Sequence, residues 1–355
     1  MNESLLKAHF AAYPGFEPRD VIKLCYQSAF GCGHLITDEA TCTRRIREEL
    51  AATPENPELP PFTPIGGGMA RLNLGSPPVR QLSPKSITRL MLLTIAHTKP
   101  QPEALCQGME MALSLAGAGE APFPREDLAE EWRKYQASGC PMVSHSESYR
   151  KANSPAYRVI LQDLCLLLPL LLEKKPLFVL DGPCGSGKTT LAGLLGEFLE
   201  GQVVPMDDFF LPPELRREER LSQPGGNLHR ERFLEQVLLP LTQGKPLAWD
   251  RYDCATGQLI PREGKTGCPL IFEGSYSHHP AFAESYRQLG ACRVWVDCGE
   301  EEQRRRLRER NPEKMKIFLK KWIPLEKDYF LAYDIPLRAD VRIPSVPWEP
   351  NSLLR

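Results

Sequence analysis

The chain has 355 residues and carries 44 Lys and Arg against 45 Asp and Glu, so its formal net charge is only -1. This balance disfavours a strongly basic nucleic-acid-binding protein, and the length predicts about two domains. Apolar residues make up 42% and charged residues 25% of the chain, a globular composition that excludes a wholly disordered or coiled-coil protein. The 34 prolines predict short elements and rigid loops, because a usual share is roughly 5%.

The cysteine pattern and the apolar runs bear on location. The 11 cysteines are scattered from Cys25 to Cys298 and include no Cys-x-x-Cys pair. This pattern is not typical of a secreted disulfide framework or of a four-thiolate zinc site. The first residues do not read as a signal peptide, and the longest apolar run, Leu164–Leu172, is far shorter than the roughly 20 residues of a membrane span. We therefore expect a cytoplasmic protein that does not enter a membrane.

Residues 1–174 read mainly as helices joined by Pro- and Gly-rich loops. Helical patterns cover residues 20–30, 38–50, 83–96, 102–115, 125–137 and 155–172. Ser83 is the expected N-cap of its helix, with Pro84 at the first helical position. The prolines within residues 53–64 predict a loop, and few alternating β-branched runs occur before residue 175. The first half is therefore predicted to be a mainly α-helical domain, without an assigned role.

From residue 175 onward, strand and helix patterns alternate. Short apolar runs predict strands at 177–180, 203–206, 270–272, 293–296 and 341–343. Helical patterns lie at 188–200, 230–241, 280–289 and 300–333. This alternation is typical of an α/β fold with a doubly wound parallel sheet, so the second domain is placed at residues 175–355.

The most specific motif follows the first of these strands. Residues 182–189 fit the pattern G-x-x-x-x-G-K-[ST] of a phosphate-binding loop, ahead of a predicted helix. Glycines let backbone N–H groups surround phosphate oxygens, and the helix start adds positive charge. Lys188 is expected to reach the β- and γ-phosphates of ATP, and the Thr189 hydroxyl to bind Mg²⁺. The expected ATP-binding residues are Gly182, Pro183, Cys184, Gly185, Ser186, Gly187, Lys188, Thr189 and Thr190.

Two further strands end in acidic residues. Asp207 follows the strand at 203–206, and Glu273 follows the strand at 270–272. Because the carboxyl ends of parallel strands share one edge of a sheet, both side chains should lie near the phosphate loop. Asp207 could orient and deprotonate an attacking hydroxyl or bind Mg²⁺, and Glu273 could hold the metal. The alternative is that these acids, and the adjacent Asp208, only form turns.

Residues 304–310 contain five arginines. At 100° per residue, Arg304 and Arg308 share one face of a helix, and Arg306 and Arg310 share another. One face could close over the phosphates as a lid and neutralise transition-state charge, and we take Arg304 and Arg308 as the catalytic candidates. The alternative is a solvated helix whose arginines pair with neighbouring glutamates.

Taken together, these motifs resemble those of the uridine kinase and phosphoribulokinase family of P-loop kinases. The loop at 182–189, the segments 206–210, 251–253 and 272–274, and the arginine helix occur in the family's order within residues 177–333. The resemblance implies a P-loop NTPase fold that uses ATP and Mg²⁺. It also implies that Asp207 is the catalytic base and that Thr189 and Glu273 bind the metal.

The resemblance also bears on the acceptor. It places Phe210, His229, Tyr252 and Asp253 in the substrate pocket. However, His229 stands where uridine kinases have an aspartate, and Gly257 lies near a position where they have a histidine. Phosphoryl transfer to a small molecule is therefore better supported than transfer to uridine. The acceptor could be a nucleoside, or a sugar, polyol or acid. An ATP-gated regulatory protein is a second class, because residues 1–174 have no kinase explanation. No nucleic-acid partner is expected, and homo-oligomerisation is left open.

Four histidines lie outside these motifs. His34 lies in a tight turn beside Cys32, without further metal ligands at a readable spacing. His145 lies among polar residues 143–150, which could line a pocket or could cap the following helix. His278 and His279 could border the substrate site.

Overall fold

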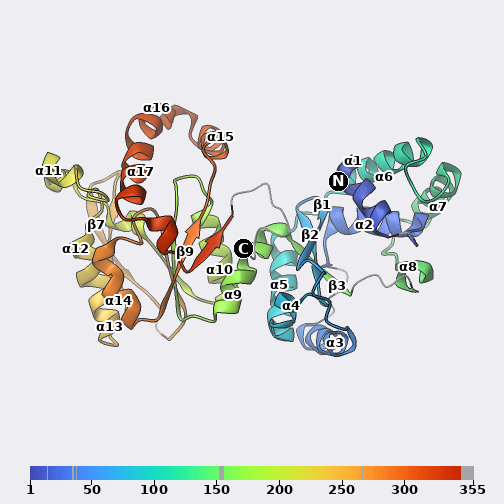
Figure 1. The fold of residues 1–355 in the computed structure, drawn as a ribbon, viewed down its shortest axis with the longest axis horizontal. Coiled ribbons are helices and arrows are strands. Elements are labelled where there is room, and N and C mark those ends of the chain that lie inside the picture. Colours follow the sequence, from blue (N-terminus) through green and yellow to red (C-terminus); the bar gives the residue numbers. More distant parts are fainter. Residues whose placement is uncertain (14, 34–35, 37, 152–155, 266, 345–355) are drawn as a thin grey trace. The chain divides into compact units, whose positions relative to one another are not determined.

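The computed structural model describes residues 1–13, 15–33, 36, 38–151, 156–265 and 267–344. The chain divides into two compact units, Met1–Leu168 and Pro169–Arg355, and Figure 1 labels many of their helices and strands. The division lies at 168/169, whereas the sequence placed it at 174/175. His34 lies outside the described residues.

Unit 1 combines helices with a small antiparallel sheet. Its helices are α1 (Glu3–Ala12), α2 (Pro18–Phe30), α3 (Glu39–Ala52), α4 (Pro77–Arg80), α5 (Pro84–His97), α6 (Pro102–Gly117), α7 (Arg125–Ala137) and α8 (Glu147–Lys151). The expected cap of α5 is confirmed, because the Ser83 side chain accepts a hydrogen bond from the Ser86 N–H. The sheet joins β1 (Phe62–Gly66), β2 (Met69–Asn73) and β3 (Tyr157–Leu161), with β2 in the middle.

This sheet was not predicted. The proline-rich stretch expected to be a loop contains β1, and β3 replaces the first part of the helix expected at 155–172, which continues as a 3-10 turn (Gln162–Leu167) and α9 (Leu168–Glu173). Strand β2 pairs with β1 on one side and with β3 on the other. The pairing of β3 with β2 overrides the helical pattern at the start of residues 155–172. The β1–β2 turn needs glycine at position 67, where φ is +62° and an added Cβ would lie 2.1 Å from the Ser28 carbonyl oxygen.

Unit 2 is built on a parallel sheet with the strand order β10-β9-β4-β8-β5. The strands are β4 (Leu177–Asp181), β5 (Gln202–Pro205), β8 (Leu270–Glu273), β9 (Ala291–Val296) and β10 (Val341–Ile343). All neighbouring pairs are parallel, so the five carboxyl ends lie at one edge, and β4 is the central strand. The α/β fold expected from the sequence is thus observed.

The connections of unit 2 carry the helices. They are α10 (Lys188–Leu199), α11 (Glu218–Leu221), α12 (Arg230–Phe233), α13 (Leu239–Thr242), α14 (Ala283–Gln288), α15 (Glu300–Arg310), α16 (Met315–Ile317) and α17 (Ile323–Ala332). Shorter 3-10 turns lie at 206–209, 213–215, 280–282, 312–314 and 335–338, and π turns at 234–238 and 318–322. An antiparallel hairpin, β6 (Ala248–Asp253) with β7 (Gln258–Glu263), was not anticipated. None of the helices in the described ranges is long and apolar enough to span a membrane.

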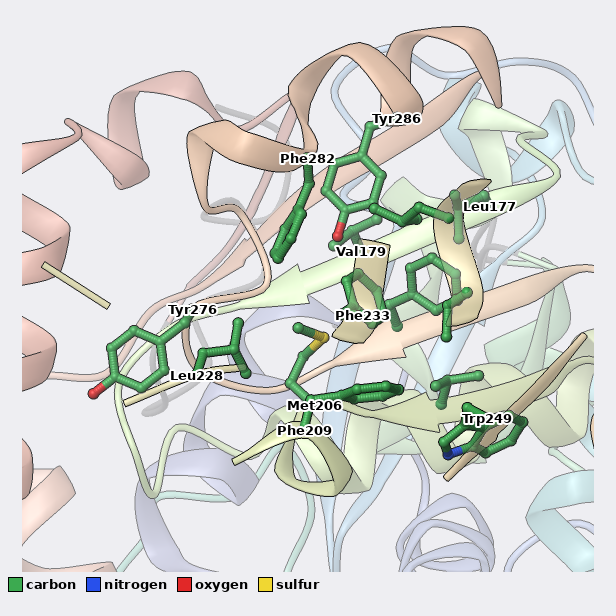
Figure 2. Close-up of a cluster of buried hydrophobic side chains, with 14 of the residues drawn as sticks. Leu177, Val179, Met206, Phe209, Leu228, Phe233, Trp249, Tyr276, Phe282 and Tyr286 are labelled. Atoms are coloured by element: carbon green, nitrogen blue, oxygen red, sulfur yellow. The ribbon is translucent and has the colours of Figure 1, made fainter. Parts of the chain in front are cut away.

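The core of unit 2 fixes the strand ends that carry the acids. Figure 2 shows Leu177 and Val179 of β4 in one buried cluster with Phe233, Phe282 and Tyr286 from the helices. A fully buried phenylalanine contributes about 1.5–3 kcal/mol relative to an exposed one. Adjacent strand residues face opposite sides, so Phe178 and Leu180 of β4 face the side where α10 packs. The same cluster includes Met206, which anchors the backbone directly before Asp207.

Candidate active site

A cavity of about 610 Å³ opens where the strands of the parallel sheet end. Segments that follow β4, β5 and β8 all contribute to its wall. The predicted site residues that line it are Cys184, Gly185, Lys188, Thr189, Asp207, Phe210 and Glu273. The fold therefore brings the loop and both strand-end acids to one place.

The phosphate loop leads from β4 into α10 and has a backbone that only glycine accommodates. Gly182, Gly185 and Gly187 have φ values of +151°, +80° and +98°. A Cβ at Gly182 would lie 2.2 Å from the carbonyl oxygen of Val296 on the neighbouring strand β9. The Ser186 hydroxyl inside the loop is buried and has no hydrogen-bond partner among the described residues. The loop thus has the compact turn that a phosphate cradle requires.

Lys188 begins α10 and folds back over the loop. Its side chain is 7% exposed, and Nζ donates to the carbonyl oxygens of Gly182 at 2.6 Å and Pro183 at 2.8 Å. These carbonyls satisfy the ammonium group without neutralising its charge. A positive charge is therefore held over the loop, where phosphate groups would lie.

Thr189 and Glu273 form a pair of oxygen donors beside the loop. The Thr189 hydroxyl donates to the Glu273 carboxylate, with Oγ1 at 3.2 and 3.3 Å from its two oxygens. Burial raises the pKa of Glu273, an effect that Lys188 opposes and the nearby charge of Asp207 adds to. No group of three or more His, Cys, Asp or Glu residues in the described ranges could hold a metal by itself. Thr189, Glu273 and Asp207 do fit Mg²⁺, which binds protein through one or two carboxylates and takes other ligands from phosphates and water.

Asp207 lies in the 3-10 turn after β5 and is open to the cavity, although protein encloses it on its other sides. This desolvation raises its pKa, with a further contribution from Asp208, while Lys188 and Arg310 lower it in part. A raised pKa makes the carboxylate a stronger proton acceptor. Asp208 has a different role, because its carboxylate accepts a hydrogen bond from Trp249 Nε1 at 2.8 Å and is buried. It anchors the β6 strand to the turn.

The arginine helix α15 packs on the phosphate loop. Gln303 Nε2 donates to the Cys184 carbonyl at 2.9 Å, and Arg306 Nη1 donates to the Gly185 and Ser186 carbonyls at 3.3 and 3.1 Å. Leu307 lies 3.3 Å from the position of a Cβ at Gly185. The helix therefore supports the loop from outside, through a face that contains Arg306 and the cavity-lining Arg310.

The two arginines chosen from the sequence lie elsewhere. Arg304 is 55% exposed and pairs with Glu300 at 3.5 Å, and Arg308 is exposed. Neither lines the cavity. Leu307 turns the other face inward, so Arg310 lines the cavity and Arg306 contacts the loop, whereas Arg304 and Arg308 do not face it. A catalytic role for any arginine of this helix stays a prediction.

Helix α17 supplies a second support that sequence reasoning missed. The buried Glu326 carboxylate accepts from the Cys184 N–H at 2.9 Å and from the Ser275 hydroxyl at 2.5 Å. Three residues on, the Tyr329 hydroxyl donates to the buried Asp181 carboxylate at 2.8 Å. Burial raises the pKa of Glu326, and Lys188 lowers it in part. No motif marks these residues, although their spacing of three places them on one helix face.

The residues that the sequence assigned to the substrate pocket are only partly found in the cavity wall. Phe210 lines it as predicted, together with Arg216, Asn227, Cys254 and Tyr276, which were not predicted. His229, Tyr252 and Asp253 do not line it.

Each of these three residues has a structural role instead. His229 Nδ1 accepts from the Arg232 N–H at the start of α12, Tyr252 is buried in β6, and Asp253 accepts from the Ala255 N–H in the hairpin turn. His278 and His279 are buried as well and do not line the cavity.

Comparisons with known proteins add a likeness in fold. No family model matches the chain, and no curated protein matches it. A solved structure described as a possible uridine kinase from Bacillus stearothermophilus is 20% identical, with a TM-score of 0.40 over 51% of this chain and 97% of that one. A second, provisionally assigned as a fructose transport system kinase from Silicibacter sp. TM1040, is 21% identical, with a TM-score of 0.41 over 51% and 98%. The strand order of unit 2 itself defines an α/β fold with a five-stranded parallel sheet.

Proposed function

We propose that unit 2 is an ATP-dependent kinase that transfers the γ-phosphoryl group of ATP to a hydroxyl group of a small molecule. One observation carries the proposal: the phosphate loop, Asp207 and Glu273 converge on a single cavity at the end of the parallel sheet. A loop alone would support nucleotide binding. A carboxylate open to the same cavity adds the group that phosphoryl transfer to an alcohol requires.

The chain's own residues would divide the work. The loop amides and Lys188 would bind the β- and γ-phosphates, and Arg310 would face the transferred group from the cavity wall. Asp207 would orient the acceptor hydroxyl and take its proton as the new O–P bond forms and the bond to ADP breaks. Thr189, Glu273 and Asp207 would hold Mg²⁺, which when bound neutralises charge on the phosphates.

The charges of the cavity wall bear on the choice between a neutral and an acidic acceptor. The cationic side chains that line it are Lys188, Arg216, Arg310, Lys314 and Lys321, against the acids Asp207, Glu273 and Glu326. Arg216 is near enough to Cys254 for its charge to lower the pKa of that thiol, which burial raises overall, and Asp207 acts on the same thiol. A guanidinium in the wall of the cavity that holds the base favours an alcohol that carries an acidic group over a neutral nucleoside.

The test is the variant Asp207→Asn, compared with Asp328→Asn at an exposed position outside the cavity. The protein would first be incubated with ATP, Mg²⁺ and a pool of metabolites, and the acceptor found by its gain of one phosphoryl mass. We expect Asp207→Asn to bind ATP normally and to lose transfer, and Asp328→Asn to retain both. Undiminished transfer by Asp207→Asn would reject the role of Asp207.

The alternative is an ATP-gated regulatory protein. It would hydrolyse ATP slowly, phosphorylate no acceptor and bind a partner only when nucleotide is present, and the same incubation distinguishes the two functions. The cytoplasmic location, the small-molecule acceptor and the absence of a nucleic-acid partner stay predictions from the sequence.

A further inference from the structure

Unit 1 encloses a guanidinium group whose nitrogens contact no acidic side chain among the described residues. Arg71 lies in the middle of β2, the central strand of the antiparallel sheet, and its side chain is 0% exposed. Burial lowers the pKa of Arg71, but the neighbouring Tyr157, Tyr149 and Tyr13 outweigh that effect and raise it. Burying a charge without a counter-charge costs free energy, part of which a bound anion would recover.

One complete edge of this guanidinium is without an acceptor. Arg71 Nη1 donates to the Tyr149 hydroxyl at 2.8 Å, but Nε and Nη2 have no hydrogen-bond partner in the described part of the chain. The Nε–H and one Nη2–H lie parallel on the same edge of the group. They form the fork with which arginine binds the two oxygens of a carboxylate.

Aromatic rings cover the flat face of the Arg71 guanidinium, but they do not accept hydrogen bonds from its Nε–H and Nη2–H groups. The guanidinium carbon lies 4.2 Å from the centre of the Tyr157 ring and 6.0 Å from that of Tyr149. Such contacts offset part of the charge, but a ring face cannot satisfy the in-plane N–H groups. The rings hold the plane of the guanidinium and so fix the direction in which its free edge points.

His145, which the sequence singled out, secures these rings. It stacks on Tyr149 at 4.2 Å between ring centres, its Nδ1 donates to Asp20 at 2.7 Å, and its Nε2 lies 2.5 Å from the Tyr157 hydroxyl. Burial lowers the pKa of His145 to about 4, so the ring is neutral and adds no charge.

The buried acid nearest this network is already in use. Asp20 accepts from His145, from the N–H and hydroxyl of Ser146, and from the Glu17 N–H. Burial alone would raise its pKa, but these hydrogen bonds outweigh that effect and lower it. His9, whose pKa falls to about 4 through burial and the charge of Arg71, is neutral too, and its Nδ1 has no described partner. An anion from outside the chain would therefore complete the cluster.

We propose that unit 1 binds a small-molecule carboxylate through the Nε and Nη2 groups of Arg71, with Tyr149 and Tyr157 as the walls of the site. A carboxylate presents two coplanar oxygens to these two parallel N–H groups, and the nearby Lys23 ammonium, whose pKa is lowered by burial and by the charge of Arg71, adds to the positive potential. The Arg71 side chain is sealed from water, so the ligand enters through a transient opening, and association is slower than about 10⁵ M⁻¹s⁻¹. This site is independent of the function proposed for unit 2.

The experiment measures thermal unfolding of the full-length protein with acetate, malate or citrate, with inorganic phosphate, and with chloride at matched ionic strength. At about one hundred times the dissociation constant, a carboxylate should raise the midpoint of unit 1 by about 5–10 °C. Arg71→Met should abolish the rise. The matched control Arg158→Met, in β3 and paired with Glu49 at 2.6 Å, should retain it.

A second measurement covers the case in which Arg71→Met does not fold. The Nε–H signals of arginine in the ¹⁵N–¹H spectrum of the wild-type protein would be followed during the titration, and one slowly exchanging signal should shift downfield with carboxylate. No carboxylate-dependent change in either measurement would overturn the proposal. A rise that persists in Arg71→Met, or a response to phosphate alone, would overturn it equally.

Discussion

Unit 1 and unit 2 each hold a buried cation, and they satisfy it in different ways. Lys188 in unit 2 is 7% exposed and donates to two loop carbonyls, whereas Arg71 in unit 1 is 0% exposed and keeps one edge without an acceptor. A lysine ammonium on a flexible stem can leave its carbonyls when a phosphate arrives, but a guanidinium held between rings cannot turn. The comparison shows two ways to hold a buried cation that could bind an anion. Backbone carbonyls accept the hydrogen bonds of Lys188, whereas Arg71 is held in place with two of its nitrogens unpaired in the described residues.

The largest expected effect concerns the cation of unit 2. Lys188→Met should lower phosphoryl transfer about 10²–10³-fold and weaken ATP binding, because the positive charge over the phosphate loop is lost. The measurement is steady-state kinetics with ATP titration by calorimetry. Lys320→Met, an exposed lysine outside the cavity, is the control. Equal activity of the two variants would mean that Lys188 only stabilises the loop through its hydrogen bonds to Gly182 and Pro183.

The next effect tests the acceptor side. Arg216→Gln should raise KM for an acidic acceptor about 10–100-fold and leave KM for ATP nearly unchanged, because a charge-assisted hydrogen bond is worth about 1.5–3 kcal/mol. Its neighbour Arg217 is exposed and does not line the cavity, so Arg217→Gln provides a matched control. If the acceptor found by mass gain is neutral and Arg216→Gln uses it as well as the wild type does, the acidic-acceptor assignment fails while the kinase assignment stands.

A smaller effect separates the two faces of the arginine helix. Arg306→Gln should lower kcat/KM for ATP about tenfold, since it removes the hydrogen bonds to the Gly185 and Ser186 carbonyls. Arg305→Gln, which loses only exposed pairs with Glu302 and Glu309, should change it less than about twofold. A larger loss in Arg304→Gln than in Arg306→Gln would restore the face predicted from the sequence.

The smallest effect is a dependence on pH. The pKa values of Asp207, Glu273 and Glu326 are raised in the folded protein, so the native state binds more protons than the unfolded state above the ordinary pKa of each acid. Stability of unit 2 should therefore fall as pH rises from about 4 through the raised values, and Glu326→Gln should flatten part of that slope. Denaturant unfolding at several pH values measures this dependence of stability on pH. An unchanged dependence in Glu326→Gln would contradict the raised pKa of Glu326.

The sequence predicted those parts of unit 2 that depend on local signals. Apolar runs located the parallel strands, and strand-end acids could be placed because parallel strands share an edge. The sheet of unit 1 was not predicted from such local signals. Pro64 made β1 look like a loop, but β1 tolerates a proline because it is an edge strand. Tertiary packing also decided the arginine face, although Leu307, the single apolar residue among 300–310, marked the buried side. Arg216 and Glu326 reach the cavity from distant segments that carry no pattern.

The two supports that α17 gives to the phosphate loop have a consequence for synthesis of the chain. The contacts of Glu326 with Cys184 and of Tyr329 with Asp181 join residues 142 and 148 positions apart. On a ribosome that adds about 5–20 residues per second, α17 follows the loop by on the order of 7–30 s. A nascent chain therefore presents a phosphate loop that is still unsupported, and nucleotide binding should begin only after α17 has emerged.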